Sequence, residues 1–286
     1  MSAELILTKD HKVYHLQLSA DQIADNVILV GDQDRVAQIS AYFSNILCRV
    51  QHREFITHTG TYNGKQISVI STGIGTDNID IVLNELDAAV NINPETRTLN
   101  ASHRQLNIIR LGTSGALQAD IPVNAIVAST HAIGLDGLLP FYQDWGKVQQ
   151  ADISAEFIKH CQWPNTLPFP YAVKANPELL ARLAGDCYHG ITATAPGFYG
   201  PQGRQIRLHS SIPSLNDLLT SFRYHEQRIT NFEMETSALY GLGALLGHRC
   251  LTMCVIIANR ANNTFTDNYQ QSITKLIEYS LNKIAS

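Results

Sequence analysis

The stretch NVILVGDQDRV, residues 26–36, shows the pattern that decides the fold class. Residues 27–30 form a short apolar run that ends at Gly31, which predicts a buried strand. An amphipathic stretch begins at Asp34 and places Val36, Ile39 and Phe43 on one face, which predicts a helix. A buried strand is therefore followed directly by a helix.

The same alternation continues along the chain. Strands are expected over 54–62, 66–71, 107–112, 124–130, 189–195 and 250–259, and helices over 79–90, 235–247 and 268–284. Such alternation predicts a three-layer α/β/α sandwich around a central sheet. The turn Asn63-Gly64 predicts a hairpin, so we expect the sheet to be mixed.

No repeat, low-complexity tract or linker interrupts this pattern, so residues 1–286 are expected to form a single domain. The least patterned region is 140–175, which contains four prolines and two tryptophans. This region is expected to form an excursion from the sheet or a cover over it.

The composition limits the possible partners. Charged residues make up 16% of the chain, well below the ~25% typical of soluble domains, so much surface should be buried in a core or a subunit interface. A net charge of -4 argues against binding to nucleic acid or to anionic membranes. No stretch approaches the ~20 apolar residues of a membrane helix, and the N-terminus lacks a secretory-signal pattern. The five scattered cysteines have no zinc-site spacing and are expected to be reduced thiols of a cytoplasmic protein.

Three arginines lie near strand ends, where they could bind an anion. In VGDQDRV, Gly31 ends the strand and Arg35 lies in the next helix, and a helix start with an arginine can bind phosphate. In IIRLGTSGA, Arg110 lies within an apolar strand and Thr113 follows it, at the strand end where α/β sheets bind ligands. Arg53 of HREF precedes the hairpin. The alternatives are a solvated helix residue for Arg35, a buried ion pair for Arg110 and a surface charge for Arg53.

The segment NFEMETSAL carries groups that could bind a sugar. Glu233 and Glu235 flank Met234 just before a predicted helix. A carboxylate can accept two hydrogen bonds from a vicinal diol such as that of ribose. Alternatively, Glu235 only stabilises the start of the helix.

The segment GFYGPQGR could bind a flat, hydrogen-bonding heterocycle. Gln202 and Arg204 can donate hydrogen bonds to it while Phe198 packs beside it, although the segment could also be an ordinary Gly/Pro loop. Arg260 ends the apolar strand CVIIAN and is a further charge at a strand end.

Several common catalytic patterns are absent from the sequence. It contains no GxGxxG, no GxxxxGK[ST], no GxSxG and no HExxH. These absences argue against dinucleotide, P-loop, serine-hydrolase and zinc-protease chemistry.

Taken together, the motifs make the sequence resemble the hexameric-type nucleoside phosphorylases, and within them the uridine phosphorylase branch. In chain order, the matching segments are VGDQDRV, HREF, STGIG, RLGTSGALQ, FYGPQGR, FEMETSAL and VIIANR. They span most of the chain, whereas 140–175 matches poorly. The resemblance implies the nucleoside phosphorylase fold and the reversible phosphorolysis of uridine to uracil and ribose 1-phosphate.

The resemblance also implies three neighbouring subsites. The phosphate subsite comprises Gly31, Arg35, Arg53, Arg110 and Thr113. The ribose subsite comprises His15, Glu233, Met234 and Glu235. The base subsite comprises Phe198, Gln202, Arg204 and Arg260. The residues expected to act in catalysis are Arg35, Arg110, Gln202, Arg204 and Glu235.

The expected partners follow from the same resemblance. The ligands are uridine and inorganic phosphate, which is a co-substrate, and no cofactor is implied. Arg53 and His15 would enter the site of a neighbouring subunit, which implies a homodimer with shared active sites or a hexamer made of three such dimers. Relatives can bind a monovalent cation with a glutamate that matches Glu54 and a serine that Asn78 replaces here, so no metal site is predicted.

The base subsite distinguishes between branches of the family. Purine-cleaving relatives carry an aspartate near the position of Arg260, whereas this chain has Asn259 before Arg260. Nucleosidase relatives use water and do not keep the arginine set. A purine or broad-specificity phosphorylase and a nucleoside-binding protein without catalysis remain the alternatives.

Two segments depart from the family pattern. FYGPQGR stands where bacterial relatives have FYPGQER, and GTDN stands where they have GGPS. The second change places Asp77 near the expected phosphate loop, where it could instead cap the following helix.

Overall fold

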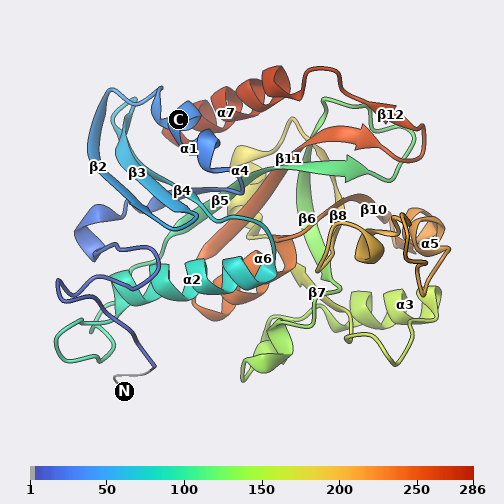
Figure 1. The fold of residues 1–286 in the computed structure, drawn as a ribbon, viewed down its shortest axis with the longest axis horizontal. Coiled ribbons are helices and arrows are strands. Elements are labelled where there is room, and N and C mark those ends of the chain that lie inside the picture. The colour runs from blue at the N-terminus through green and yellow to red at the C-terminus, as the bar shows by residue number, and fades with distance from the viewer. Residues whose placement is uncertain (1–3) are drawn as a thin grey trace.

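The computed structural model describes residues 4–286 and shows a mixed sheet with helices on both sides (Figure 1). The strands are β1 (Asn26–Val30), β2 (Asn45–His52), β3 (Phe55–Tyr62), β4 (Lys65–Ser71), β5 (Asn107–Ala116), β6 (Ile126–Gly134), β7 (Tyr171–Lys174), β8 (Tyr188–Thr194), β9 (Arg223–Tyr224), β10 (Gln227–Glu233), β11 (Arg249–Asn259) and β12 (Thr264–Phe265). The α-helices are α1 (Gln33–Ser40), α2 (Thr76–Asn91), α3 (Ala151–Cys161), α4 (Pro177–Leu183), α5 (Leu215–Ser221), α6 (Thr236–Leu245) and α7 (Tyr269–Ala285). Short 3-10 helices are η1 (Ala20–Gln22), η2 (Leu139–Phe141), η3 (Trp145–Lys147) and η4 (Gly200–Gln202).

The centre of the sheet consists of parallel strands. β1 pairs in parallel with β4 on one side and with β5 on the other, and β5 pairs in parallel with β11. The β3–β4 hairpin is antiparallel, and β2 extends it at the edge of the sheet. The predicted mixed sheet is therefore confirmed, and the turn residues Asn63 and Gly64 adopt the positive φ angles of 45° and 79° that such a hairpin turn needs.

Part of the sheet closes into a ring, which the sequence did not predict. β11 pairs with β6, β6 with β8, β8 with β10, and β10 with the end of β5, which itself pairs with β11. The β10–β5 pairing joins Asn231 to Ala116 and Phe232 to Gly115. These pairings bring the end of β10, with its glutamates, next to β5.

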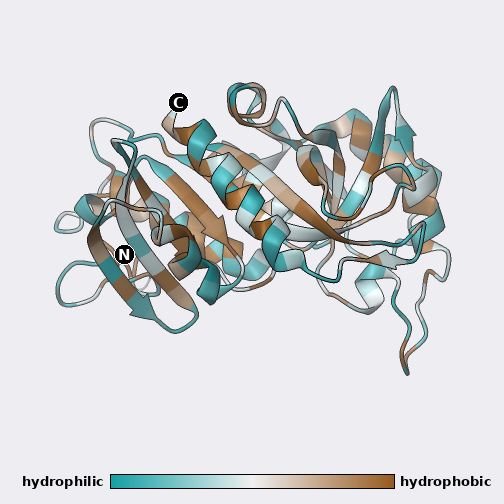
Figure 2. Cartoon of the chain, turned by 90° about the horizontal axis from the view of Figure 1, so that it is seen from above, coloured by the Kyte–Doolittle hydropathy of each residue, from teal (hydrophilic) through white to brown (hydrophobic). Residues whose placement is uncertain are grey.

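Helices cover the sheet from two sides. In Figure 1, α1 and α7 lie along its upper side and α2 and α6 along its lower side, and β11 contacts both α6 and α7. Figure 2 shows that the helix ending at the C-terminus, α7, carries both hydrophobic and hydrophilic residues. Its buried residues are Ser272, Ile273, Leu276, Ile277, Ser280, Leu281 and Ile284, which follow the spacing of an amphipathic helix. None of the helices within residues 4–286 is long and apolar enough to cross a membrane.

Helix α6 is apolar on nearly all sides and is buried in the protein. Two glycines allow it to pack closely against its neighbours. A Cβ at Gly243 would lie 2.2 Å from Cys250 Sγ, and one at Gly241 would lie 2.7 Å from Leu139 Cδ1. This close packing holds α6 against Leu139 and Cys250.

Residues 140–175 are more than a cover over the sheet. They form η3, α3 and β7, and β7 pairs antiparallel with β6. The prolines of this region obscured its strand pattern.

The first predicted helix also ends earlier than expected, at Ser40 rather than Phe43.

Candidate active site

The predicted residues Gly31, Arg110 and Glu233 lie at the ends of β1 and β10 and in the middle of β5. The loop that follows β4 approaches the end of β1 closely, because a Cβ at Gly31 would lie 3.3 Å from the carbonyl oxygen of Gly73. In the β1–β5 pairing, Leu29 stands opposite Arg110. The glycine-ended strand of the sequence analysis thus borders the strand that carries the buried arginine.

Arg110 forms a buried cluster with two carboxylates. Its Nη2 donates to Oε2 of Glu235, and its Nη1 lies 3.4 Å from Oε2 of Glu233. Each of the three residues is at most 5% exposed. Burial alone would lower the pKa of Arg110, but Glu235, Cys254 and Glu233 raise it above its ordinary value. The guanidinium therefore stays charged.

Gly112 makes room for this guanidinium. A Cβ at position 112 would lie 2.3 Å from Nη1 of Arg110 and 3.0 Å from Sγ of Cys254. Nη1 also lies 3.4 Å from that sulfur. Nε of Arg110 is buried and has no hydrogen-bond partner within residues 4–286.

Arg35 brings a second buried cation to the same strand. It is 7% exposed, and its Nη1 donates to the carbonyl oxygen of Leu111 at 3.2 Å. Burial lowers the pKa of Arg35, Asp32 opposes this effect, and the positive charge of Arg110 lowers the pKa further. Arg110 is close enough to disfavour the charge of Arg35, and two neighbouring cations form a suitable site for an anion.

Glu235 connects two loops of the site. Its Oε1 accepts a hydrogen bond from the backbone N–H of Gly75 at 2.8 Å, and Gly75 is the N-cap residue of α2. Gly75 has a φ of 102°, a conformation that favours glycine. Burial and the neighbouring Glu233 raise the pKa of Glu235, while Arg110 opposes them.

Glu233 stabilises the start of α6. Its carboxylate accepts the backbone N–H groups of Glu235 at 2.9 Å and of Thr236 at 3.0 Å, together with the hydroxyl of Thr194 at 2.7 Å. These donors, with Arg110, occupy most of its acceptor sites. The sequence pattern could not distinguish Glu233, which caps the helix, from Glu235, which has fewer partners.

The four predicted base-site residues lie together. Nη1 of Arg204 donates to Oε1 of Gln202 at 2.7 Å, and Nη2 of Arg260 donates to the same oxygen at 3.1 Å. The guanidinium of Arg204 lies over the ring of Phe198, 3.7 Å from its centroid. Burial, followed by the charge of Arg204, lowers the pKa of Arg260 to about 10. The cluster is thus rich in donors and positive charge.

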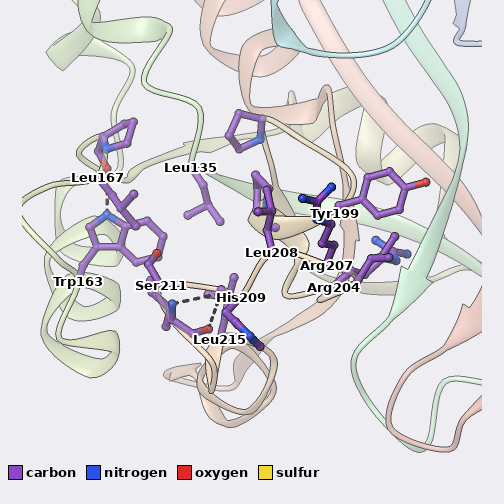
Figure 3. A pocket seen from close by; sticks show the side chains of 17 residues that line it. Leu135, Trp163, Leu167, Tyr199, Arg204, Arg207, Leu208, His209, Ser211 and Leu215 are labelled. Atoms are coloured by element: carbon purple, nitrogen blue, oxygen red, sulfur yellow. Dashed lines mark hydrogen bonds between the residues drawn. The ribbon is translucent and has the colours of Figure 1, made fainter.

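A cavity of about 610 Å³ lies beside this cluster. Trp163 and Leu167 form one wall, and Tyr199, Arg204 and Arg207 form the opposite wall (Figure 3). The cavity is mostly apolar. Arg204 of the predicted base subsite lines it, whereas Arg35, Arg110 and Glu235 do not.

Arg53 and His15 both lie beside the ring of Tyr14. The guanidinium of Arg53 lies 5.7 Å from the ring centroid of Tyr14. Nδ1 of His15 lies 2.6 Å from Oε1 of Glu85, and its carbonyl oxygen lies 3.0 Å from Nδ1 of His52. That these two residues enter a partner's site stays a prediction.

Thr113 and Met234 flank the buried cluster. Thr113 follows Arg110 on β5, opposite Val255 of β11. The backbone N–H of Met234 lies 3.3 Å from Oε2 of Glu235. Sequence reasoning missed the roles of Gly75, Gly112 and Cys254, because each depends on a contact between distant parts of the chain.

One other cluster has ligand types that suit a metal. Asp87, His103 and His248 place one potential ligand atom each within 4.8 Å of the others. However, the backbone N–H of Leu106 donates to Nδ1 of His248 at 3.2 Å, so the proton of a neutral His248 lies on Nε2. Nε2 lies 3.3 Å from Oδ1 of Asp87. Because a protonated nitrogen cannot ligate a metal, we interpret this cluster as a polar contact that stabilises the fold.

A family model described as the phosphorylase superfamily matches residues 25–284. The chain belongs to this superfamily. The match spans every strand and every α-helix except the last residue of α7, and it includes all the predicted site residues except His15. The predicted fold class is therefore confirmed.

Several phosphorylases resemble the chain over nearly its whole length. The uridine phosphorylase of Thermococcus kodakarensis is 32% identical over 274 residues, which cover 93% of this chain and 84% of the relative. A DeoD-type purine nucleoside phosphorylase of Clostridium perfringens is 27% identical, with 93% and 96% covered. The crystal structure of a Trypanosoma brucei nucleoside phosphorylase, described as showing uridine phosphorylase activity, superposes with a TM-score of 0.88 at 30% identity and covers 99% of this chain and 100% of that one.

Proposed function

We propose that this phosphorylase catalyses the reversible phosphorolysis of uridine to uracil and ribose 1-phosphate. Two observations carry the proposal. The first is the donor cluster of Gln202, Arg204 and Arg260, in which Arg260 lies over the ring of Phe232, next to Glu233 of the buried Arg110 cluster. The second is the pair of buried arginines, Arg35 and Arg110. The donor cluster suits a base that leaves with negative charge, and the two buried arginines suit phosphate. The uridine phosphorylase names of the T. kodakarensis and T. brucei relatives support the same choice.

Phosphate is the nucleophile in this proposal. Arg35 and Arg110 bind it with Gly31 and Thr113, and Arg53 joins them from the neighbouring subunit. A phosphate oxygen attacks C1′ as the C1′–N1 bond breaks, and the bonding electrons leave with uracil, which afterwards takes up a proton. Phosphate also offsets the positive charge that develops on the sugar. No side chain needs to act as a nucleophile.

In this proposal, the ribose lies between the phosphate subsite and the base subsite. Glu235 is the group proposed to accept hydrogen bonds from the ribose hydroxyls, because Arg110 and Gly75 hold its carboxylate in place. Met234 packs nearby, and His15 of the neighbouring subunit reaches the 5′-hydroxyl. Glu233 contributes by capping α6 and so fixing Glu235.

The base subsite offers donors to the uracil oxygens. Oε1 of Gln202 accepts hydrogen bonds from both Arg204 and Arg260, which leaves its Nε2 as the free donor. Uracil gains negative charge as it leaves, so its hydrogen bonds to these groups strengthen in the transition state. Phe198 packs against the ring.

The remaining features of the proposal concern the protein as a whole. We propose one domain, a homodimer with shared sites or a hexamer of three dimers, and a cytoplasmic location. Phosphate is the only co-substrate and no cofactor takes part. The free cysteines within residues 4–286 agree with a reducing compartment.

The decisive experiment measures base release from uridine, thymidine, inosine and adenosine, with and without phosphate. We expect uridine cleavage that depends on phosphate and that arsenate can also support. Equal cleavage without either anion would indicate a nucleosidase. Preference for inosine or adenosine would indicate a purine phosphorylase, and binding without turnover would indicate a nucleoside-binding protein.

A further inference from the structure

Arg260 is held by neutral oxygens only. Its Nη1 donates to the carbonyl oxygen of Gln202 and to Oδ1 of Asn216, the latter at 3.1 Å, and its Nη2 donates to Oε1 of Gln202. Among residues 4–286, no carboxylate forms an ion pair with Arg260 or Arg204. Asn216 lies on α5, so it is the acceptor that ties Arg260 to a helix outside the 198–204 loop.

We propose that Asn216 is a positioning residue for the leaving base: it holds Arg260 through a neutral acceptor, so that the positive charge of Arg260 stays available to the departing uracil. This inference rests on the proposed function. A carboxylate at the same place would hold the guanidinium equally well but would neutralise its charge. An apolar side chain would leave the charge but release the guanidinium. An asparagine avoids both effects.

Gly203 provides the space that this arrangement needs. It has a φ of 71°, and a Cβ there would lie 2.9 Å from Nδ2 and 3.1 Å from Oδ1 of Asn216. Any side chain at position 203 would therefore press on the Asn216 amide. The glycine and the asparagine therefore form a matched pair in this chain.

Asn216 acts on the base indirectly, through Arg260 and Gln202. Arg260 and Arg204 both donate to Oε1 of Gln202, which fixes the orientation of the Gln202 amide. If Arg260 shifts, Gln202 loses one of the two donors that hold its oxygen. Asn216 therefore acts on two groups of the base subsite without touching the phosphate residues.

The test compares Asn216→Leu and Asn216→Asp with the wild type, using uridine and 5-fluorouridine at saturating phosphate. Fluorine makes the uracil anion a better leaving group, so 5-fluorouridine needs less stabilisation by the protein. We expect both variants to lower kcat/KM for uridine about tenfold and to lower it less for 5-fluorouridine. The KM for phosphate should not change. The matched control is Asn282→Leu, since Oδ1 of Asn282 on α7 also accepts one side-chain hydrogen bond, from Tyr62 at 2.8 Å.

Three results would overturn the inference. The first is unchanged kinetics in both variants, and the second is an equal loss of kcat/KM on both substrates. The third is a wild-type kcat/KM in Asn216→Asp, which would indicate a purely structural hydrogen bond. If Asn216→Leu does not fold, the substrate ratio of Asn216→Asp decides alone. A wild-type protein without phosphate-dependent uridine cleavage would overturn the proposed function and this inference together. That failure is distinct, because it is visible before any variant is made.

Discussion

Arg110 and Glu235 form an ion pair in which the arginine is 5% and the glutamate 3% exposed. Removing two charges from water is costly, and an apolar pair of similar size is often at least as stable. The cluster also leaves Nε of Arg110 without a partner among the described residues. Stability alone therefore does not explain the pair, whereas the proposed function gives it a role in orienting a carboxylate and an arginine for substrates.

The first prediction tests how tightly this pair is positioned. Gly112→Ala should displace the guanidinium of Arg110, because the new Cβ would lie 2.3 Å from Nη1. A displacement of about 1 Å at such a site can lower activity about 100-fold. We expect kcat/KM for uridine to fall by that order and the KM for phosphate to rise.

Gly185→Ala is the control for this substitution. Gly185 is exposed, and a Cβ there would meet nothing within 4 Å. Its kinetics should match the wild type. Unchanged phosphate binding in a folded Gly112→Ala variant would show that Arg110 does not bind phosphate.

The second prediction concerns the base subsite. Arg204→Ala removes a charged donor that lies over Phe198 and holds Gln202, so it should cost about 2–4 kcal/mol of transition-state stabilisation for uridine. Phosphate binding should change little. Steady-state kinetics with each substrate varied in turn would measure both effects. Arg223→Ala, which removes an exposed arginine on β9, should behave like the wild type.

The sequence predicted the framework of the fold because that framework has local signals. Alternating apolar runs and amphipathic helices placed the central strands, and the Asn63-Gly64 turn placed the hairpin. The ring closed by β10 and β5 has no such signal, since it depends on Asn231 and Phe232 pairing with residues over a hundred positions earlier. The strand β7 was hidden in a proline-rich region.

The site shows the same division between local and distant signals. A charge inside an apolar strand identified Arg110, and strand-end glycines identified Gly31. The sequence could not separate Glu233 from Glu235, because only the fold shows that Glu233 accepts the first N–H groups of α6. It also could not indicate Asn216, whose contact with Arg260 spans 44 positions.

The third prediction concerns the contribution to stability of Asp87 on α2 and His248, the residue before β11. Asp87 contacts His248 and accepts a hydrogen bond from Asn91 at 2.7 Å. Burial opposes ionisation, but His248 and Asn91 lower the pKa of Asp87 below its ordinary value of 3.8. The ionised carboxylate therefore stabilises the fold. Asp87→Asn should lower the free energy of unfolding by about 1–3 kcal/mol at pH 7.

The pH dependence of this effect has a definite sign. Since the folded pKa is depressed, the stabilisation is fully present above the ordinary pKa of 3.8 and is lost as the pH falls through the folded value. Urea unfolding of wild type and Asp87→Asn from pH 7 downward should show the difference shrinking below pH 3.8. Asp186→Asn, which disrupts an exposed pair with Lys283, should change little at any pH. An equal difference in the free energy of unfolding at every pH would show that the charge of Asp87 does not cause the stabilisation.

The last prediction tests whether two chains share each site. Arg53 and His15 lie on one surface around Tyr14, and Arg53 has a φ of 55° that presents its side chain from a tight turn. If Arg53 serves the partner's site, Arg110→Ala should inactivate the site of its own subunit and Arg53→Ala that of the partner. In a two-fold dimer of one variant with the other, both lesions fall in one site and the second site is intact.

Unfolding and refolding equal amounts of the two inactive variants together should therefore restore activity to about a quarter of all sites, because half of the dimers are mixed and each has one working site. Co-expression with two affinity tags would isolate the mixed dimer directly and give half of the wild-type activity per dimer. Each variant refolded alone is the control and should remain inactive. A folded mixed dimer without activity would show that Arg53 acts in its own chain or in no site, and an active monomer at assay concentration would contradict the shared site altogether.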